Sequence, residues 1–121
     1  MKGAAAGVFA TCLLAAPSAI AQTSDPDQRE FVSDLAIVSV GAGICRRYEL
    51  NPASVMIYSM TYNVEAGDVG KGGRLYPVFA EAFGGAKVAF ANQSSEMVCA
   101  ALELMYGPLG VARRALVMTS D

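Results

Sequence analysis

The sequence predicts an all-α protein, a small single-domain bundle of about four helices stapled by one disulfide. Three observations lead to this prediction. Apolar residues recur three and four positions apart in several segments, which is the spacing of one helical face. Residues typical of helix starts and stops bound these segments. Two cysteines remain once an N-terminal leader is set aside, an even count that indicates one bridge.

Residues 1–21 have the pattern of a secretory signal peptide. Lys2 precedes a short apolar segment, and Ala19 and Ala21 form the small-residue pattern of a cleavage site. The apolar segment is shorter than the roughly 20 residues that a membrane span needs. We therefore expect cleavage after Ala21, a periplasmic or secreted location in a bacterium, no stable membrane insertion, and one helical domain over residues 22–121.

The charge balance argues against nucleic acid as a partner. The chain has 9 basic and 11 acidic residues, and removal of Lys2 with the leader leaves 8 against 11, a net charge of −3. Nucleic-acid binding depends on clustered positive charge. The two basic pairs, Arg46-Arg47 and Arg113-Arg114, are predicted near helix ends, where cations interact favourably with the helix dipole.

Cys45 and Cys99 are predicted to form a disulfide, because an exported protein folds in an oxidising compartment. The chain contains no histidine. A metal site would thus lack ligands beyond two sulfurs, and a nucleophilic cysteine would lack its usual base. We expect no metal, no cofactor and no catalytic residue.

The first helix is predicted over residues 26–49. Asp25 is the N-cap, Pro26 takes the first helical position, and Gln28 completes a capping box. One apolar face follows at steps of 4, 3, 4 and 3, formed by Phe31, Leu35, Val38, Ala42 and Cys45. The first cysteine therefore lies on the inner face of this helix.

A second helix is predicted from Pro52, with Asn51 as its cap and Gly67 as its stop. Residues 53–66 also carry a strand pattern, because Met56, Tyr58, Met60 and Tyr62 alternate. The chain offers no second strand of comparable quality, and an unpaired strand is not stable. Helix is the favoured prediction, and strand stays the alternative.

The glycine-rich residues 66–74 are predicted to be a loop, followed by a third helix that is interrupted or kinked at Gly84-Gly85. The apolar face of this helix consists of Leu75, Phe79, Ala82, Ala86 and Phe90. Ser94 or Ser95 then caps a fourth helix that ends at Gly107-Pro108. Its inner face contains Val98, Cys99, Leu102, Met105 and Tyr106.

The C-terminal residues 109–117 are predicted to add a last turn or two of helix. The apolar side chains expected to dock there are Leu109, Val111, Leu116 and Val117.

Met56, Tyr58, Met60 and Tyr62 are the candidate partner surface. Methionine adapts to irregular partners, and tyrosine is enriched at interfaces. The alternative is that most of these side chains belong to the core. The favoured hypothesis is an exported protein-interaction protein whose partner is another protein or a second copy of this chain.

Two other functions are considered. An exported helical domain without histidine and with one long-range disulfide, Cys45–Cys99, resembles in layout the acid-stress periplasmic chaperones of the HdeA type. That resemblance implies that the protein opens in acid and holds unfolded clients. A hydrolase would need paired carboxylates, for which the candidates are Glu96 with Glu103 and Glu65 with Asp68. Because carboxylates on surface helices are usually solvated, we do not expect an enzyme.

Overall fold

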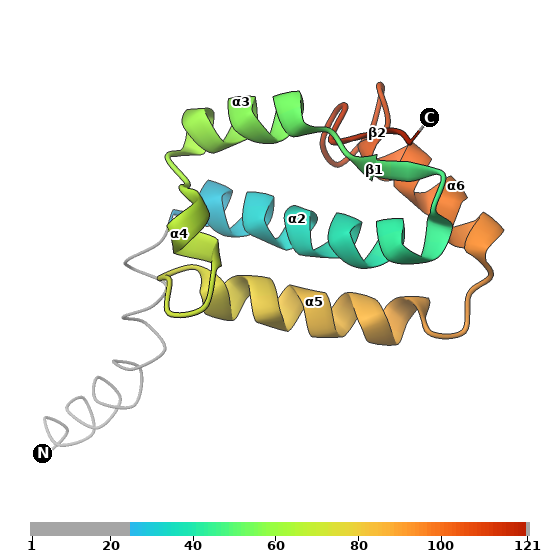
Figure 1. Cartoon of the computed structure of the whole chain (residues 1–121), viewed down its shortest axis with the longest axis horizontal. Helices are drawn as coiled ribbons and strands as arrows, with labels where there is room; N and C mark the ends of the chain where they lie inside the picture. Colours follow the sequence, from blue (N-terminus) through green and yellow to red (C-terminus); the bar gives the residue numbers. More distant parts are fainter. Residues whose placement is uncertain (1–24, 121) are drawn as a thin grey trace, which may run out of the picture.

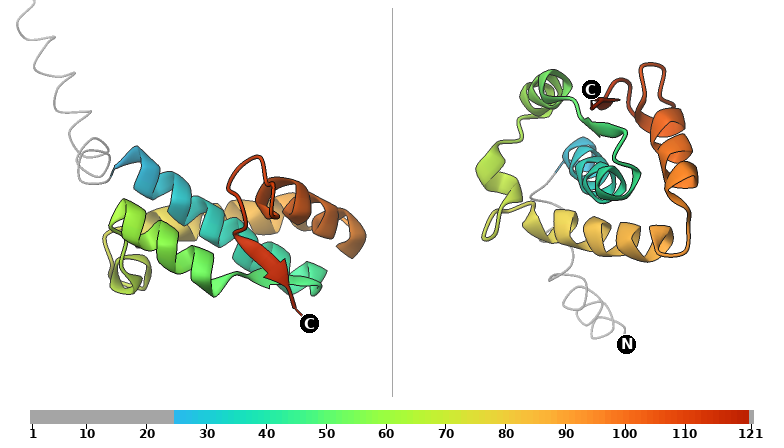
Figure 2. Two further views of the ribbon diagram at one scale, coloured as in Figure 1. Left: turned by 90° about the horizontal axis from the view of Figure 1, so that it is seen from above. Right: turned by 45° about the vertical axis from the view of Figure 1, so that its right-hand side comes forward.

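The computed structural model describes residues 25–120, and in this part of the chain a central helix is surrounded by the other elements (Figure 1). The elements are α2 (Pro26–Cys45), β1 (Tyr48–Leu50), α3 (Pro52–Tyr62), α4 (Ala66–Val69), α5 (Tyr76–Phe90), α6 (Ser95–Tyr106) and β2 (Val117–Thr119). Figure 2 shows α3, α5 and α6 arranged around α2. The all-α prediction is confirmed, whereas the predicted signal peptide lies outside the described residues.

Helix α2 begins as the sequence predicts and ends earlier. The Asp25 side chain accepts the N–H of Asp27, and Gln28 completes the capping box. The predicted end at residue 49 is wrong, because Arg46 takes a left-handed conformation with φ of 70° after the last helical residue, Cys45. The backbone then becomes extended and forms β1.

The two short strands were not predicted. They pair antiparallel, with Tyr48 opposite Thr119 and Leu50 opposite Val117. The prediction of a final helix over residues 109–117 is wrong, since the chain turns after α6 and then enters β2. Gly110 fits tightly in that turn, because a Cβ there would lie 2.4 Å from the backbone oxygen of Met105.

The four apolar side chains expected to dock the C-terminal segment divide into two pairs. Leu116 and Val117 are buried as predicted, whereas Leu109 and Val111 are exposed. The turns after α6 place Leu116 and Val117 against the core and direct Leu109 and Val111 toward solvent.

The segment with mixed signals is helical. In α3 the Asn51 side chain accepts the N–H groups of Ala53 and Ser54, as a cap does. The helix ends before the predicted Gly67, because Asn63 adopts a left-handed conformation with φ of 58°. Part of the predicted glycine-rich loop forms the short helix α4.

The other two helices agree closely with their predicted ranges. Helix α5 runs unbroken through Gly84-Gly85, so the predicted interruption is wrong. Helix α6 is capped by the Ser94 side chain, whose oxygen accepts the N–H of Met97 at 3.1 Å. Both glycines of α5 face open space, which explains why no neighbour forces a break there.

The core lies between α2 and the elements that surround it. Its largest fully buried side chains are Tyr106, Phe31, Leu75, Leu102, Leu116, Val32, Val38 and Val98. Helices α2 and α6 approach closely at Gly41, where a Cβ would stand 2.9 Å from a methyl carbon of Leu102. By contrast, none of the residues of α3 is buried, and α5 buries only Ala86.

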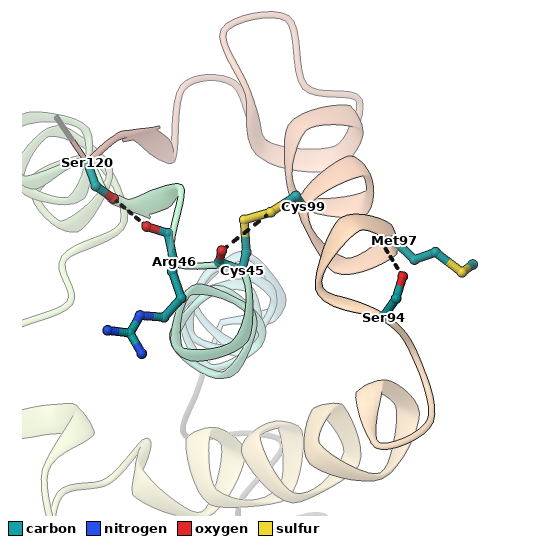
Figure 3. Close-up of a disulfide and its surroundings, with 6 residues drawn as sticks. All are labelled: Cys45, Arg46, Ser94, Met97, Cys99 and Ser120. Atoms are coloured by element: carbon teal, nitrogen blue, oxygen red, sulfur yellow. Dashed lines mark hydrogen bonds between the residues drawn. A yellow bond between two sulfur atoms is a disulfide. The ribbon is translucent and has the colours of Figure 1, made fainter.

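The predicted disulfide is present. It joins Cys45 at the end of α2 to Cys99 in α6, with the two Cα atoms 5.0 Å apart (Figure 3). Next to it, the Ser120 hydroxyl donates to the backbone oxygen of Arg46 at 3.3 Å. The C-terminal end of α2 is therefore tied both to α6 and to the residues that follow β2.

Candidate functional site

The four residues of the candidate partner surface lie on two different faces of α3. Met56 and Met60 are 60% and 71% exposed, and Ile57 beside them is 62% exposed. Tyr58 and Tyr62 are partly buried against the core, with their rings stacked at a centroid distance of 6.2 Å. The two methionines therefore remain available for a partner, whereas the two tyrosines belong to the interior.

The tyrosines surround a buried arginine. The guanidinium carbon of Arg113, a residue only 8% exposed, lies 5.1 Å from the ring centroid of Tyr58 and 5.3 Å from that of Tyr62. The ring of Phe31 lies 5.5 Å away. Three aromatic faces around one guanidinium are favourable cation–π contacts, and burial strengthens them.

Asp34 neutralises this arginine. Its Oδ2 accepts a hydrogen bond from Arg113 Nε at 2.8 Å, and its Oδ1 accepts one from the Tyr106 hydroxyl at 2.7 Å. Arg113 Nη1 also donates to the Tyr62 hydroxyl oxygen at 3.0 Å. We call Asp34, Tyr62, Tyr106 and Arg113 the arginine cluster. Within residues 25–120, no buried side-chain nitrogen or oxygen lacks a hydrogen-bond partner.

The basic pairs predicted near helix ends differ in their outcome. Arg46 is the C-cap of α2, as predicted. Arg113 instead lies in the turns between α6 and β2 with its side chain buried, so the prediction is wrong for this residue. A signal was available in Asp34, because an acid three residues after Phe31 and four before Val38 stands on the apolar face and requires a partner.

The arginine cluster has a structural role, which is to hold α3 against α2. Arg113 connects Asp34 in α2 with Tyr62 in α3. Two further bonds support α3, since the Tyr58 hydroxyl donates to the backbone oxygen of Arg114 at 2.9 Å and Gln28 Nε2 donates to that of Tyr62 at 2.7 Å. Burial alone lowers the pKa of Arg113, but the hydrogen bonds to Asp34 and Tyr62 raise it overall, so the guanidinium stays charged.

Replacing Tyr106 by phenylalanine is expected to change how stability depends on alkaline pH. Burial, and then the hydrogen bond to the Asp34 carboxylate, raises the pKa of Tyr106 above its ordinary value. The folded state thus holds this proton more tightly than the unfolded state. Its contribution to stability is complete below about pH 10 and is lost as the pH rises further, by up to about 1.4 kcal/mol per unit.

Urea unfolding of wild type and Tyr106→Phe at pH 8, 10 and 11 measures this effect. Above pH 10, the free energy of unfolding should decrease less steeply with pH for the variant than for wild type. It should also be less stable at pH 8 by about 1–3 kcal/mol, because Asp34 loses one hydrogen bond. If the free energy of unfolding decreased equally steeply with pH for both proteins above pH 10, the assigned role of Tyr106 would be contradicted.

A groove lies between α3 and α5. Its central hollow measures about 550 Å³ and has Leu35 of α2 among its walls. The other apolar residues around it come from α3, α4, α5 and the turns that join them, and are Val55, Val64, Ala66, Val69, Tyr76 and Phe79. Figure 1 shows α4 at one end of the helices α3, α2 and α5, where the chain passes from α3 to α5.

Two further hollows extend the groove. One of about 440 Å³ shares Ser59, Val64 and Glu65 with the central hollow and adds Met56 and Met60. The other, of about 380 Å³, shares Tyr76 and Phe79 and continues along α5 to Phe83 and Lys87. We call these three neighbouring hollows, which share wall residues and extend from Met56 to Lys87, the α3–α5 groove.

The carboxylates considered for a hydrolase come from two elements, with Glu96 and Glu103 in α6 and Glu65 and Asp68 at the start of α4. Glu96 and Glu103 are both exposed on α6, and only Glu103 lines the small hollow beside Leu104 and Leu109. Glu65 lines the α3–α5 groove and forms a capping box with Asp68, whose Oδ2 accepts the backbone N–H of Glu65 at 2.9 Å. The Asp68 carboxylate also pairs with Arg74 at 3.4 Å.

The described residues lack two further features, a metal-binding cluster and a membrane-spanning helix. Residues 25–120 contain no group of three or more histidine, cysteine, aspartate or glutamate residues placed to hold a metal ion. In the same part of the chain, no helix combines the length and apolar character that a membrane span requires.

Models of known protein families, curated protein sequences and solved structures were each compared with this chain, and none of the three comparisons found a match.

Proposed function

We propose that this chain is an exported protein-binding protein that holds a segment of one partner protein in the α3–α5 groove. The observation that carries the proposal is the combination of an apolar groove with a wall, α3, that buries none of its own residues. An exposed apolar surface such as the central hollow is typical of a site that another molecule covers. Export is part of the proposal and rests on the pattern of residues 1–21.

Both walls of the groove support a protein partner. On the α3 side, Met56 and Met60 offer flexible, polarizable side chains that adapt to a protein surface. On the α5 side, groove residues recur at steps of 3, 1, 3, 1 and 3 along one helical face, which consists of Tyr76, Phe79, Ala80, Phe83, Gly84 and Lys87. This spacing places the six residues on one side of α5, where they present a single surface to a bound segment.

The arginine cluster supports the proposal indirectly, because it sets the rotation of α3. With Tyr58 and Tyr62 fixed toward Arg113, the opposite face of the helix carries Met56 and Met60 to the groove and to solvent. The cluster therefore positions the binding surface without contacting the partner.

The test is capture of a partner from periplasmic extract by the oxidised mature protein at neutral pH. We expect one stoichiometric partner with wild type, and at least a tenfold loss of capture with Met56→Ser/Met60→Ser. The matched control, Met97→Ser/Leu104→Ser, removes two exposed apolar side chains from α6 and should keep the partner. Equal capture by both double variants would contradict the groove as the binding site.

An acid-activated holding chaperone is the second candidate, and the buried ion pair between Asp34 and Arg113 favours it. Arg113 faces two carboxylates, Asp34 at 2.8 Å and the exposed Glu30 at 3.9 Å. Separating a buried charge from its partner is costly, so conditions that weaken this contact would loosen α3. The same capture experiment at pH 3 separates the two functions. Many unrelated clients bound only in acid would support the chaperone and overturn the single-partner proposal.

A further inference from the structure

Two charged side chains line the α3–α5 groove, and they have opposite signs. Glu65 lies where the central hollow meets the Met56 hollow, and Lys87 lies at the far end along α5. Within residues 25–120 neither forms a salt bridge. The Lys87 ammonium is instead placed over the ring of Phe83, 5.7 Å from its centroid.

The dimensions of the α5 wall suit a short helix. Tyr76, at the central hollow near Glu65, and Lys87 are eleven residues apart along α5. That separation corresponds to a rise of roughly 16 Å, or about three helical turns. Two residues eleven positions apart on a docked helix lie on nearly the same face, so both can face the groove.

The walls of the groove favour a helix over an extended segment. They are formed mainly by α2, α3, α4 and α5, whose backbone groups are largely engaged in helical hydrogen bonds. The one sheet of the described residues, β1 with β2, contributes no residue to the groove. An extended segment would therefore dock with its backbone groups unpaired, whereas a helix satisfies its own.

We infer that the partner segment is an amphipathic helix of at least three turns. Its apolar stripe faces the groove, a basic residue lies at Glu65, and an acidic residue lies at Lys87. This inference rests on the proposed function and specifies the kind of segment that the groove accepts.

The test uses three synthetic 18-residue helical peptides with the same stripe of leucine and alanine. They differ at two positions, eleven residues apart beside the stripe, which carry Lys and Glu, two Lys, or two Glu. Their affinities for the oxidised mature protein are measured by fluorescence anisotropy at low salt. Because exposed ion pairs are worth up to about 1 kcal/mol, wild type should bind the mixed peptide up to about fivefold more tightly than either like-charged peptide.

Charge reversal in the protein should redirect this preference. Lys87→Glu should prefer the peptide with two Lys, and Glu65→Lys the peptide with two Glu, and the preferences should weaken as salt screens the charges. Glu65→Gln, which should bind the mixed and the two-Glu peptides equally, replaces Glu65→Lys if that variant does not fold. The matched control Glu103→Lys makes the same charge change on α6, outside the groove, and should keep the wild-type preference.

Three results would overturn the inference. The first is binding with no dependence on peptide charge. The second is that wild type binds none of the peptides but still captures its partner through Met56 and Met60. That result would overturn the helix inference and leave the proposed function intact. The third is self-association of the protein in which the Glu65→Lys variant, when mixed with the Lys87→Glu variant, forms a dimer with it. That result would assign the groove to a second copy of this chain.

Discussion

Arg113→Ala is expected to lower the free energy of unfolding by about 3–5 kcal/mol, the largest effect that we expect from a single substitution. The variant leaves the Asp34 carboxylate buried without its countercharge. It also removes the guanidinium from the space between Phe31, Tyr58 and Tyr62. The stability of Arg113→Lys should lie between that of wild type and that of Arg113→Ala. A lysine ammonium keeps the charge but lacks the planar guanidinium that reaches both Asp34 and Tyr62.

The neighbouring residue supplies the control. Arg114 is exposed, and only its backbone oxygen is used, as the acceptor for Tyr58. Arg114→Ala should therefore change stability by no more than about 0.5 kcal/mol. Denaturant unfolding at neutral pH measures both variants, and an equal loss for the two would show that Arg113 does not hold α3 in the way described.

Removal of the disulfide should cost about 4 kcal/mol. Cys45 and Cys99 are 54 residues apart in the sequence, and a cross-link over a loop of that length removes much of the freedom of the unfolded chain. A small domain depends strongly on such a bridge because its core is modest. The change is the double variant Cys45→Ala/Cys99→Ala, measured by denaturant unfolding with and without reductant.

Dependence on reductant separates the bridge from side-chain packing. When reductant is added, the free energy of unfolding of wild type should fall close to that of the double variant. The free energy of unfolding of the double variant should not change. A wild-type protein that loses less than about 1 kcal/mol on reduction would show that the fold does not rely on the link between α2 and α6.

Features set by neighbouring residues were predictable from the sequence. The caps at Asp25 and Asn51 were identified, and Ser94 was one of two candidates, because a cap acts on backbone groups two or three positions away. The disulfide was predictable because only two cysteines follow residues 1–21. The helix ends at Arg46 and Asn63 were missed, since neither residue signals a left-handed conformation as clearly as glycine does.

Features that depend on distant segments were not predictable. The strands β1 and β2 have three residues each and are stabilised by pairing across most of the chain. Arg113 and Arg114 look alike in sequence, and only the turns after α6 decide which of them is buried. Within the candidate partner surface, α3 turns Met56 and Met60 outward and Tyr58 inward against the core, a division that the residue types alone did not indicate.

Photo-crosslinking in the producing cells tests the central claim most directly, which is that the α3–α5 groove binds a partner protein. A photoreactive benzoyl-phenylalanine replaces Met60 in the groove or, in the matched control, Leu104 on α6, since both side chains are similarly exposed. We predict one crosslinked product of defined mass from position 60 and none from position 104. Crosslinking from position 104 alone, or the same products from both positions, would contradict the assignment of the groove.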